Sequence, residues 1–175
     1  MYIIDFIDKM SRAFVKENDL EHAGIDIPER PISPEKNYVT PNGLQELKEN
    51  ILLLEQQKNE LMQSNDYSNK QKKQQLERDL RYFIKRLESA ILVNPKEQDK
   101  RKVLFSAFVD IENDFGSVSS FQIVGEDESN IKINKIAYTS PLAKALIGNK
   151  VDDEVLFNKP SGHEVLTIVK IQYKL

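Results

Sequence analysis

The chain has 175 residues, enough for one ordinary domain or two small ones, and 39% of them are hydrophobic while 30% are charged. Its formal net charge of -3 argues against a general DNA- or RNA-binding protein, which would carry an excess of Lys and Arg. Without cysteine there are no disulfides and no thiolate metal sites. No apolar run approaches the roughly 18 residues of a membrane-spanning helix, and the acidic start is unlike a signal peptide. We expect a cytoplasmic protein with no membrane contact and no cofactor of its own.

Proline residues recur regularly in the N-terminal part of the chain. Pro28, Pro31 and Pro34 recur at every third position, which disfavours a helix at each preceding residue and removes backbone donors that a sheet would need. We therefore expect an extended N-terminal tail over residues 1–36.

Apolar residues then recur at helical spacing in two stretches. The first begins at Thr40 and Pro41, which suit a helix N-cap and the first helical position, and the second ends before Asn94. The two apolar stripes consist of Leu44, Leu47, Ile51, Leu54 and Leu61, and of Leu76, Leu80, Phe83, Leu87 and Ala90 or Ile91. A short polar loop separates them, so the sequence predicts an antiparallel coiled-coil hairpin over residues 37–97 with its tip near 63–70. The alternatives are helices that cover the rest of the protein, and helices that pair between chains in a coiled-coil adaptor.

From Val103 the period of the apolar residues becomes two, which predicts strands. Glu112 to Gly116 is typical of a hairpin turn, and Pro141 to Ile147 is the one helical interruption. The strands are expected at 105–111, 121–124, 131–138, 155–157 and 165–173. Together these features predict an α+β domain over residues 98–175.

A self-contained enzyme is hard to build from these residues. The sequence has no Gly-rich phosphate loop, no Ser or Cys nucleophile near a plausible His base, and no cluster with metal-ligand spacing. His163 is expected to lie exposed in a hairpin turn. The three consecutive acids Glu126, Asp127 and Glu128 have hard oxygen ligands for a divalent cation, but adjacent carboxylates at a turn more often form a solvated surface.

Three segments of the C-terminal half resemble the Gre family of transcript-cleavage factors. They are IVGEDE (123–128), SPLAKALIG (140–148) and the acidic turn before Val155, and they occur in the family's order and at its spacing. The resemblance implies a short-armed, GreA/GreB-like member with an FKBP-like C-terminal domain. It also implies a monomeric transcription elongation factor whose partner is the core of bacterial RNA polymerase. A run that begins at Met10 resembles the leader of a shorter-armed subgroup, so Met1 and Met10 are alternative starts.

For the hairpin tip, the resemblance implies a mechanism in which the nuclease activity belongs to the polymerase. Gre factors push the tip through the secondary channel, where paired acids of the pattern D-x-x-E-N help the polymerase hold its second Mg²⁺ and position water at backtracked RNA. Asp66 matches the first acid, but Asn69 stands at the second. Each helix is also about one heptad shorter than the usual arm, which withdraws the tip by roughly 10 Å. Two functions therefore stay open: stimulation of RNA cleavage through Asp66, and occupation of the channel without cleavage.

The resemblance also implies a docking site. It places Thr139, Ser140 and Pro141 against a coiled coil at the rim of the polymerase channel, with Thr139 where the family usually has Asp or Asn. Taken alone, Ser140 and Pro141 are explained equally well by the capped start of a helix. A prolyl isomerase, suggested by the FKBP-like fold only, would need a deep pocket lined by aromatic residues.

The tip of the hairpin carries a second candidate for partner contacts. Basic residues there suit contact with phosphates near the RNA 3′ end or with acidic channel walls, and ordinary solvated charge is the alternative. These residues are Lys70, Lys72 and Lys73.

Overall fold

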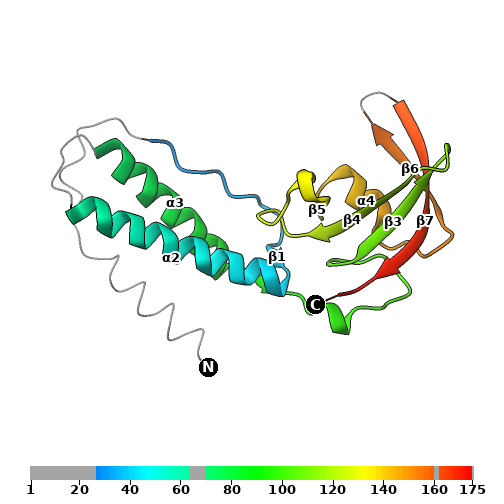
Figure 1. Ribbon diagram of the computed structural model, residues 1–175, viewed down its shortest axis with the longest axis horizontal. Helices are drawn as coiled ribbons and strands as arrows, with labels where there is room; N and C mark the ends of the chain where they lie inside the picture. The colour runs from blue at the N-terminus through cyan, green and yellow to red at the C-terminus, as the bar shows by residue number, and fades with distance from the viewer. Residues whose placement is uncertain (1–26, 64–69, 160–161, 175) are drawn as a thin grey trace.

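The protein, described by a computed structural model over residues 27–63, 70–159 and 162–174, consists of a helical arm and a β domain that meet at the base of the arm (Figure 1). The elements in chain order are β1 (Tyr38–Val39), α2 (Pro41–Gln63), α3 (Lys70–Glu88), β2 (Ile91–Leu92), η2 (Pro95–Glu97), β3 (Phe108–Asn113), β4 (Val118–Val124), η3 (Ile131–Ile133), β5 (Lys135–Ala137), α4 (Pro141–Leu146), β6 (Glu154–Lys159) and β7 (Gly162–Gln172). The predicted α+β class, with a helical hairpin followed by a sheet domain, is confirmed. Among the described helices none is long and apolar enough to cross a bilayer.

The arm is a hairpin of α2 and α3, which lie side by side along one apolar seam (Figure 1). Leu47 of α2 and Leu80 of α3 are buried in this seam, as their spacing predicts. Lys58 occupies the one seam position that is not apolar, and its ammonium group pairs with Glu77 of α3 at 3.4 Å. With a rise of 1.5 Å per residue, the 23 residues of α2 and the 19 of α3 span roughly 35 and 29 Å. The seam is thus filled within one chain, unlike the arrangement of a coiled-coil adaptor.

The start of α2 follows the predicted cap. Gly43 N donates a hydrogen bond of 3.0 Å to Thr40 Oγ1, and Leu44 N donates one of 2.9 Å to Thr40 O. Pro41 at the first helical position has no N–H that would need a partner. The first turn of α2 is therefore capped by a residue of its own sequence.

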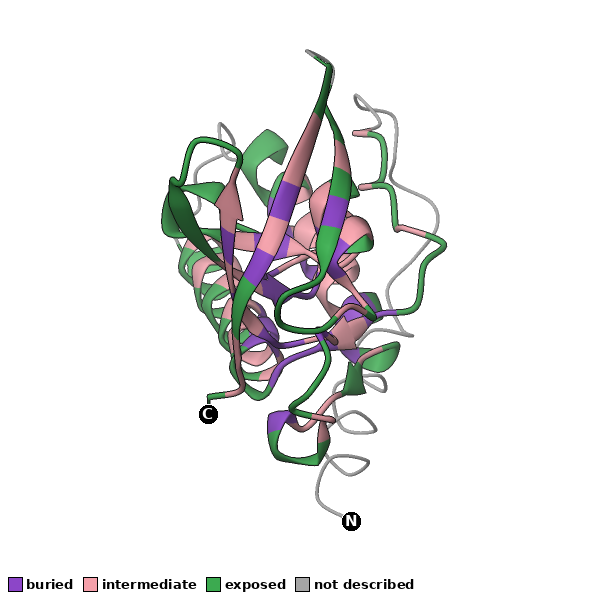
Figure 2. Cartoon of the chain, turned by 90° about the vertical axis from the view of Figure 1, so that its right-hand side faces the viewer, coloured by how far each residue is buried: buried purple, intermediate pink, exposed green. Residues whose placement is uncertain are grey.

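The β domain is a five-stranded mixed sheet with strand order β5-β4-β3-β7-β6. β4 and β5 are parallel, and the other neighbours are antiparallel. Buried positions alternate with more exposed ones along the strands (Figure 2). The core lies between this sheet and α4 and includes Val109, Ile111, Ile123, Ile136, Leu146, Leu166 and Ile168. The hairpin turn between β3 and β4 and the short helix α4 lie where the sequence predicts them.

All five predicted strands have different bounds in the structure, and two of them begin later than predicted. The alternation that begins at Phe105 does not form a strand until Phe108, because Ser106 has a positive φ of 69° that breaks the extended backbone. The predicted strand 131–138 is also wrong at its start, where Ile131–Ile133 form the 3-10 helix η3. Asn134 ends η3 in the left-handed region, and only Lys135–Ala137 pair as a strand.

The base of the arm is closed by backbone pairing and packs on the β domain through aromatic rings. β1 enters α2, and it pairs in parallel with β2, which follows α3. The ring of Tyr38 lies 5.8 Å from that of Phe105 and 5.5 Å from that of Tyr138, measured between centroids. Phe105 and Tyr138 are 5.9 Å apart, so the three rings form one cluster across the junction.

The described part of the predicted tail, residues 27–36, has no helix or strand and lies along α3. The guanidinium carbon of Arg30 is 3.8 Å from the ring centroid of Tyr82. Glu29 forms an ion pair of 2.5 Å with Arg81 of α3. This segment thereby contacts Arg81 and Tyr82 of α3.

Candidate functional site

The predicted docking motif lies at the start of α4. Ser140 caps this helix, since its hydroxyl accepts a hydrogen bond of 3.3 Å from Ala143 N. Thr139 Oγ1 donates a hydrogen bond of 3.1 Å to Glu126 Oε1. Pro141, at the first helical position, is exposed. The two polar side chains of the motif are therefore engaged inside the protein, and the proline ring is the part that faces solvent.

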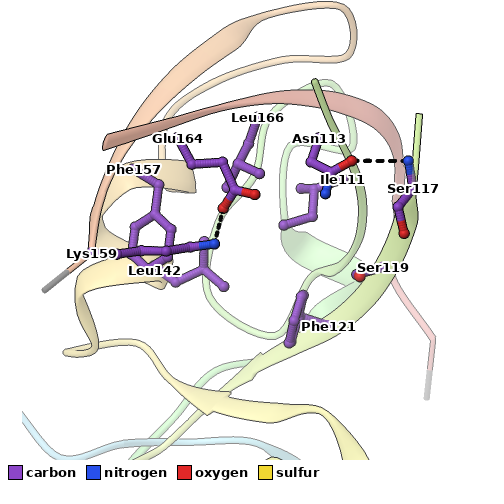
Figure 3. Close-up of a pocket in the computed structure, with 10 residues that line it drawn as sticks. All are labelled: Ile111, Asn113, Ser117, Ser119, Phe121, Leu142, Phe157, Lys159, Glu164 and Leu166. Atoms are coloured by element: carbon purple, nitrogen blue, oxygen red, sulfur yellow. Dashed lines mark hydrogen bonds and ion pairs between the residues drawn. The ribbon is translucent and has the colours of Figure 1, made fainter. Parts of the chain in front are cut away.

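An open cleft of about 220 Å³ lies between the sheet and α4 (Figure 3). Phe121, Leu142 and Phe157 supply its apolar lining, and Leu142 follows the exposed proline directly. Lys159 and Glu164 form an ion pair at one edge. An apolar centre with a polar rim is a common arrangement in protein-binding surfaces. The exposed proline is thus the immediate sequence neighbour of a residue that lines the cleft.

The acidic triplet, Glu126-Asp127-Glu128, lies at the junction with the arm and is not the solvated turn that the sequence suggests. Glu128 is only 6% exposed. Its carboxylate accepts hydrogen bonds from Thr40 N at 2.9 Å and from Thr40 Oγ1 at 2.5 Å. A carboxylate is favourable at this place, because the first backbone N–H groups of a helix carry partial positive charge. Glu128 of the β domain therefore holds the N-terminus of α2.

Asp127 holds the other helix of the arm. Arg86 of α3 donates from Nε to Asp127 Oδ2 at 2.5 Å, and the Tyr82 hydroxyl donates to Oδ1 at 2.6 Å. Burial, followed by this hydrogen bond, raises the pKa of Tyr82 to about 12, so its hydroxyl remains a donor at neutral pH. Arg86 is 2% exposed, so its charge is buried at the junction rather than solvated.

Glu126 connects the junction with the docking motif. Its Oε2 lies 3.5 Å from Arg86 Nη2. Its Oε1 accepts hydrogen bonds from Ser33 at 3.0 Å and from Thr139 at 3.1 Å. A single carboxylate thus contacts the segment before the arm, helix α3 and the residue before the capped start of α4.

Two glycines make room for this junction. A Cβ atom built on Gly43 would overlap the carboxyl group of Glu128. A Cβ atom on Gly125 would lie 2.5 Å from the carbonyl oxygen of Tyr38. Both positions therefore require glycine for close approach of the arm to the β domain.

At the far end of the arm, the predicted basic residues Lys70, Lys72 and Lys73 occupy the first turn of α3 and are exposed. The predicted tip acid Asp66 and its neighbour Asn69 lie outside the described residues. In the described ranges, no group of three or more His, Asp or Glu side chains has the geometry to hold a metal ion.

Comparison with known proteins shows which family has this architecture. The family model described as "Transcription elongation factor, GreA/GreB, C-term" matches residues 97–173. The chain is 34% identical over 154 residues to transcription elongation factor GreB of Neisseria meningitidis serogroup B, a match that covers 79% of this chain and 94% of that protein. The chain belongs to the GreA/GreB family. GreB of Haemophilus influenzae is 39% identical over 105 residues, covering 60% of this chain and 66% of that one.

Solved structures that the chain matches include GreA factor homolog 1 (Gfh1) of Thermus thermophilus. It is 24% identical, and the match covers 79% of this chain and 99% of that chain with a TM-score of 0.38. A GreA/GreB elongation factor from Nitrosomonas europaea is 20% identical, with coverage of 79% and 99% and a TM-score of 0.40.

As a GreA/GreB family member, the chain is a transcription elongation factor. The sequence predicted the Ser140 cap of α4, but not the contacts of the acidic triplet with Arg86, Tyr82 and Thr40. One signal was present: Gly43 sits in the first turn of a helix, where alanine would be favoured by about 1 kcal/mol. A helical glycine of this kind indicates close approach of another group.

Proposed function

We infer that this elongation factor binds core RNA polymerase through the surface formed by Pro141 and the adjacent cleft, and directs its arm into the secondary channel. The observation that carries this inference is the exposure of Pro141 beside the apolar cleft, because the rest of its motif is engaged internally. The arm is long enough, at roughly 30 Å, to reach from a docked β domain into a channel. The protein would act in the cytoplasm as a monomer.

The chemistry in this proposal belongs to the polymerase, and the protein is an accessory factor rather than an enzyme. Asp66 would supply one carboxylate to the second Mg²⁺ of the polymerase, an ion that prefers hard oxygen ligands. Lys70, Lys72 and Lys73 would lie near the RNA 3′ end, where exposed ammonium groups suit contact with phosphate.

Occupation of the channel without stimulated cleavage is the second candidate function. It is favoured by Asn69 at the position of the second acid. A neutral amide binds Mg²⁺ more weakly than a carboxylate does, and a single remaining acid leaves the ion less well held.

The docking surface can be tested with Pro141→Arg. An arginine at this exposed position places a charge on the apolar surface without altering the core, so affinity for core polymerase should fall at least about tenfold, or roughly 1.4 kcal/mol. The measurement is a titration of labelled factor with core polymerase. Leu156→Arg is the matched control, because Leu156 is 58% exposed and, one residue before Phe157 in β6, points to the opposite face of the sheet. Equal affinities for both variants and the wild type would mean that docking occurs elsewhere.

The tip can be tested on backtracked polymerase complexes at limiting Mg²⁺. Stimulation of cleavage by the wild type should be weak and should disappear in Asp66→Ala, because one carboxylate stands where the family uses two. Asn69→Glu should raise the cleavage rate if the arm reaches the metal. No gain with Asn69→Glu, together with no cleavage by the wild type, would favour the channel-occupying function. Robust cleavage that survives Asp66→Ala would exclude Asp66 as the tip ligand.

A further inference from the structure

The acidic triplet contacts both helices of the arm at separate points. Glu128 binds the N-terminus of α2 through Thr40, and Asp127 binds α3 through Arg86 and Tyr82. One contact would leave the arm free to rotate about it. Two contacts on two helices, with the aromatic cluster beside them, define the direction of the arm relative to the β domain.

The contact through Arg86 requires a particular orientation of its guanidinium group. The guanidinium group is planar with donors in a fixed arrangement, so it engages Asp127 through Nε and approaches Glu126 through Nη2 only in one orientation of α3. Because Arg86 is almost fully buried, a movement of α3 that separates it from these carboxylates would leave an unpaired charge inside the protein. The junction therefore resists bending.

The direction of the arm matters because its tip is far from the junction. For an arm of roughly 30 Å, a rotation of about 10° at the base displaces the tip by about 5 Å. A displacement of that size would take a tip side chain out of reach of a metal ion or of an RNA phosphate, since reacting groups must be placed within about 1 Å.

We propose that the acidic triplet and Arg86 form an interdomain latch, in which Arg86, Asp127 and Glu128 are positioning residues that fix the direction of the arm relative to the docking surface. This role rests on the function proposed above. Glu126 belongs to the same latch and contacts Thr139 of the docking motif, so the docking surface and α3 share one carboxylate.

The direct test measures the arm without polymerase. The sequence has no cysteine, so Asn59→Cys on α2 and Lys170→Cys on β7, both at exposed positions, provide a unique pair of spin-label sites. In this background, Asp127→Asn keeps the side-chain shape but removes the charge, and Arg86→Met removes the guanidinium group. Both changes should make the interdomain distance distribution at least about twofold broader, because states with other arm directions become populated.

Arg78→Met is the matched control for this measurement. Arg78 lies on the same helix and, within the described residues, its ion pair is with Asp79 of the arm at 3.0 Å, so its loss should leave the distribution as narrow as in the wild type. A purely structural role for Arg86 would lower the melting temperature without broadening the distribution. Unchanged distributions in both Asp127→Asn and Arg86→Met would overturn the proposal.

A second measurement uses core polymerase and the full chain. Asp127→Asn should change the affinity for polymerase by less than about twofold, while photo-cross-linking from Asn59→Cys into the channel should fall at least about fivefold at saturation. Equal cross-linking by Asp127→Asn and the wild type would contradict the latch. The latch and the proposed docking surface can be refuted independently. The distance measurement tests the latch without polymerase, and the affinity of Pro141→Arg for polymerase tests docking without depending on the direction of the arm.

Discussion

Replacing Leu80 by alanine should lower the free energy of unfolding by about 2–5 kcal/mol. Leu80 is 2% exposed and packs in the cluster that includes Leu47, Ile51 and Leu87. Truncation removes apolar contacts and leaves a cavity between the two helices of the arm. The loss should be visible as an earlier transition of the helical circular-dichroism signal in urea.

The matched control is Leu53→Ala on α2. Leu53 is a leucine in the same arm but is 52% exposed, so its truncation should change stability by no more than about 0.5 kcal/mol. Similar losses for the two variants would mean that the seam does not hold the arm together. A smaller loss for Leu80→Ala than for Leu53→Ala would place the packing surface on the other side of α2.

The helical seam could be predicted from the sequence because its signal is local. Leu76 and Leu80, or Leu47 and Ile51, are four residues apart, and helical geometry places them on one face wherever the helix lies. The cap at Thr40 and the turn before Gly116 are local in the same sense, and both are confirmed.

The acidic triplet could not be predicted in this way, because its partners are distant in the sequence. Asp127 is 41 residues from Arg86, and Glu128 is 88 residues from Thr40. A run of three acids has the same composition whether it is solvated or buried against donors, so only the fold distinguishes the two. The bounds of the strands fail for another reason: the positive φ values of Ser106 and Asn134 depend on the surrounding packing rather than on strand propensity.

Gly43→Ala should destabilise the protein by about 1–3 kcal/mol, although helix propensity alone predicts a gain of about 1 kcal/mol. Gly43 lies in the first turn of α2, and a Cβ atom there would overlap the carboxyl group of Glu128. The carboxylate would have to leave Thr40 N and Thr40 Oγ1, which are buried donors that would lose their acceptor. Thermal unfolding of the single variant gives the sign of the effect.

A double-mutant cycle identifies the cause of this effect. In a Glu128→Ala background the overlap is gone, so Gly43→Ala should now raise the melting temperature, as expected for alanine in place of glycine in a helix. The change of sign between the two backgrounds isolates the contact between α2 and the β domain from the intrinsic preference of the helix. Stabilisation by Gly43→Ala in the wild-type background would show that Glu128 does not occupy the N-terminus of α2 in solution. Destabilisation of equal size in both backgrounds would instead trace the requirement for glycine to a neighbour other than this carboxylate.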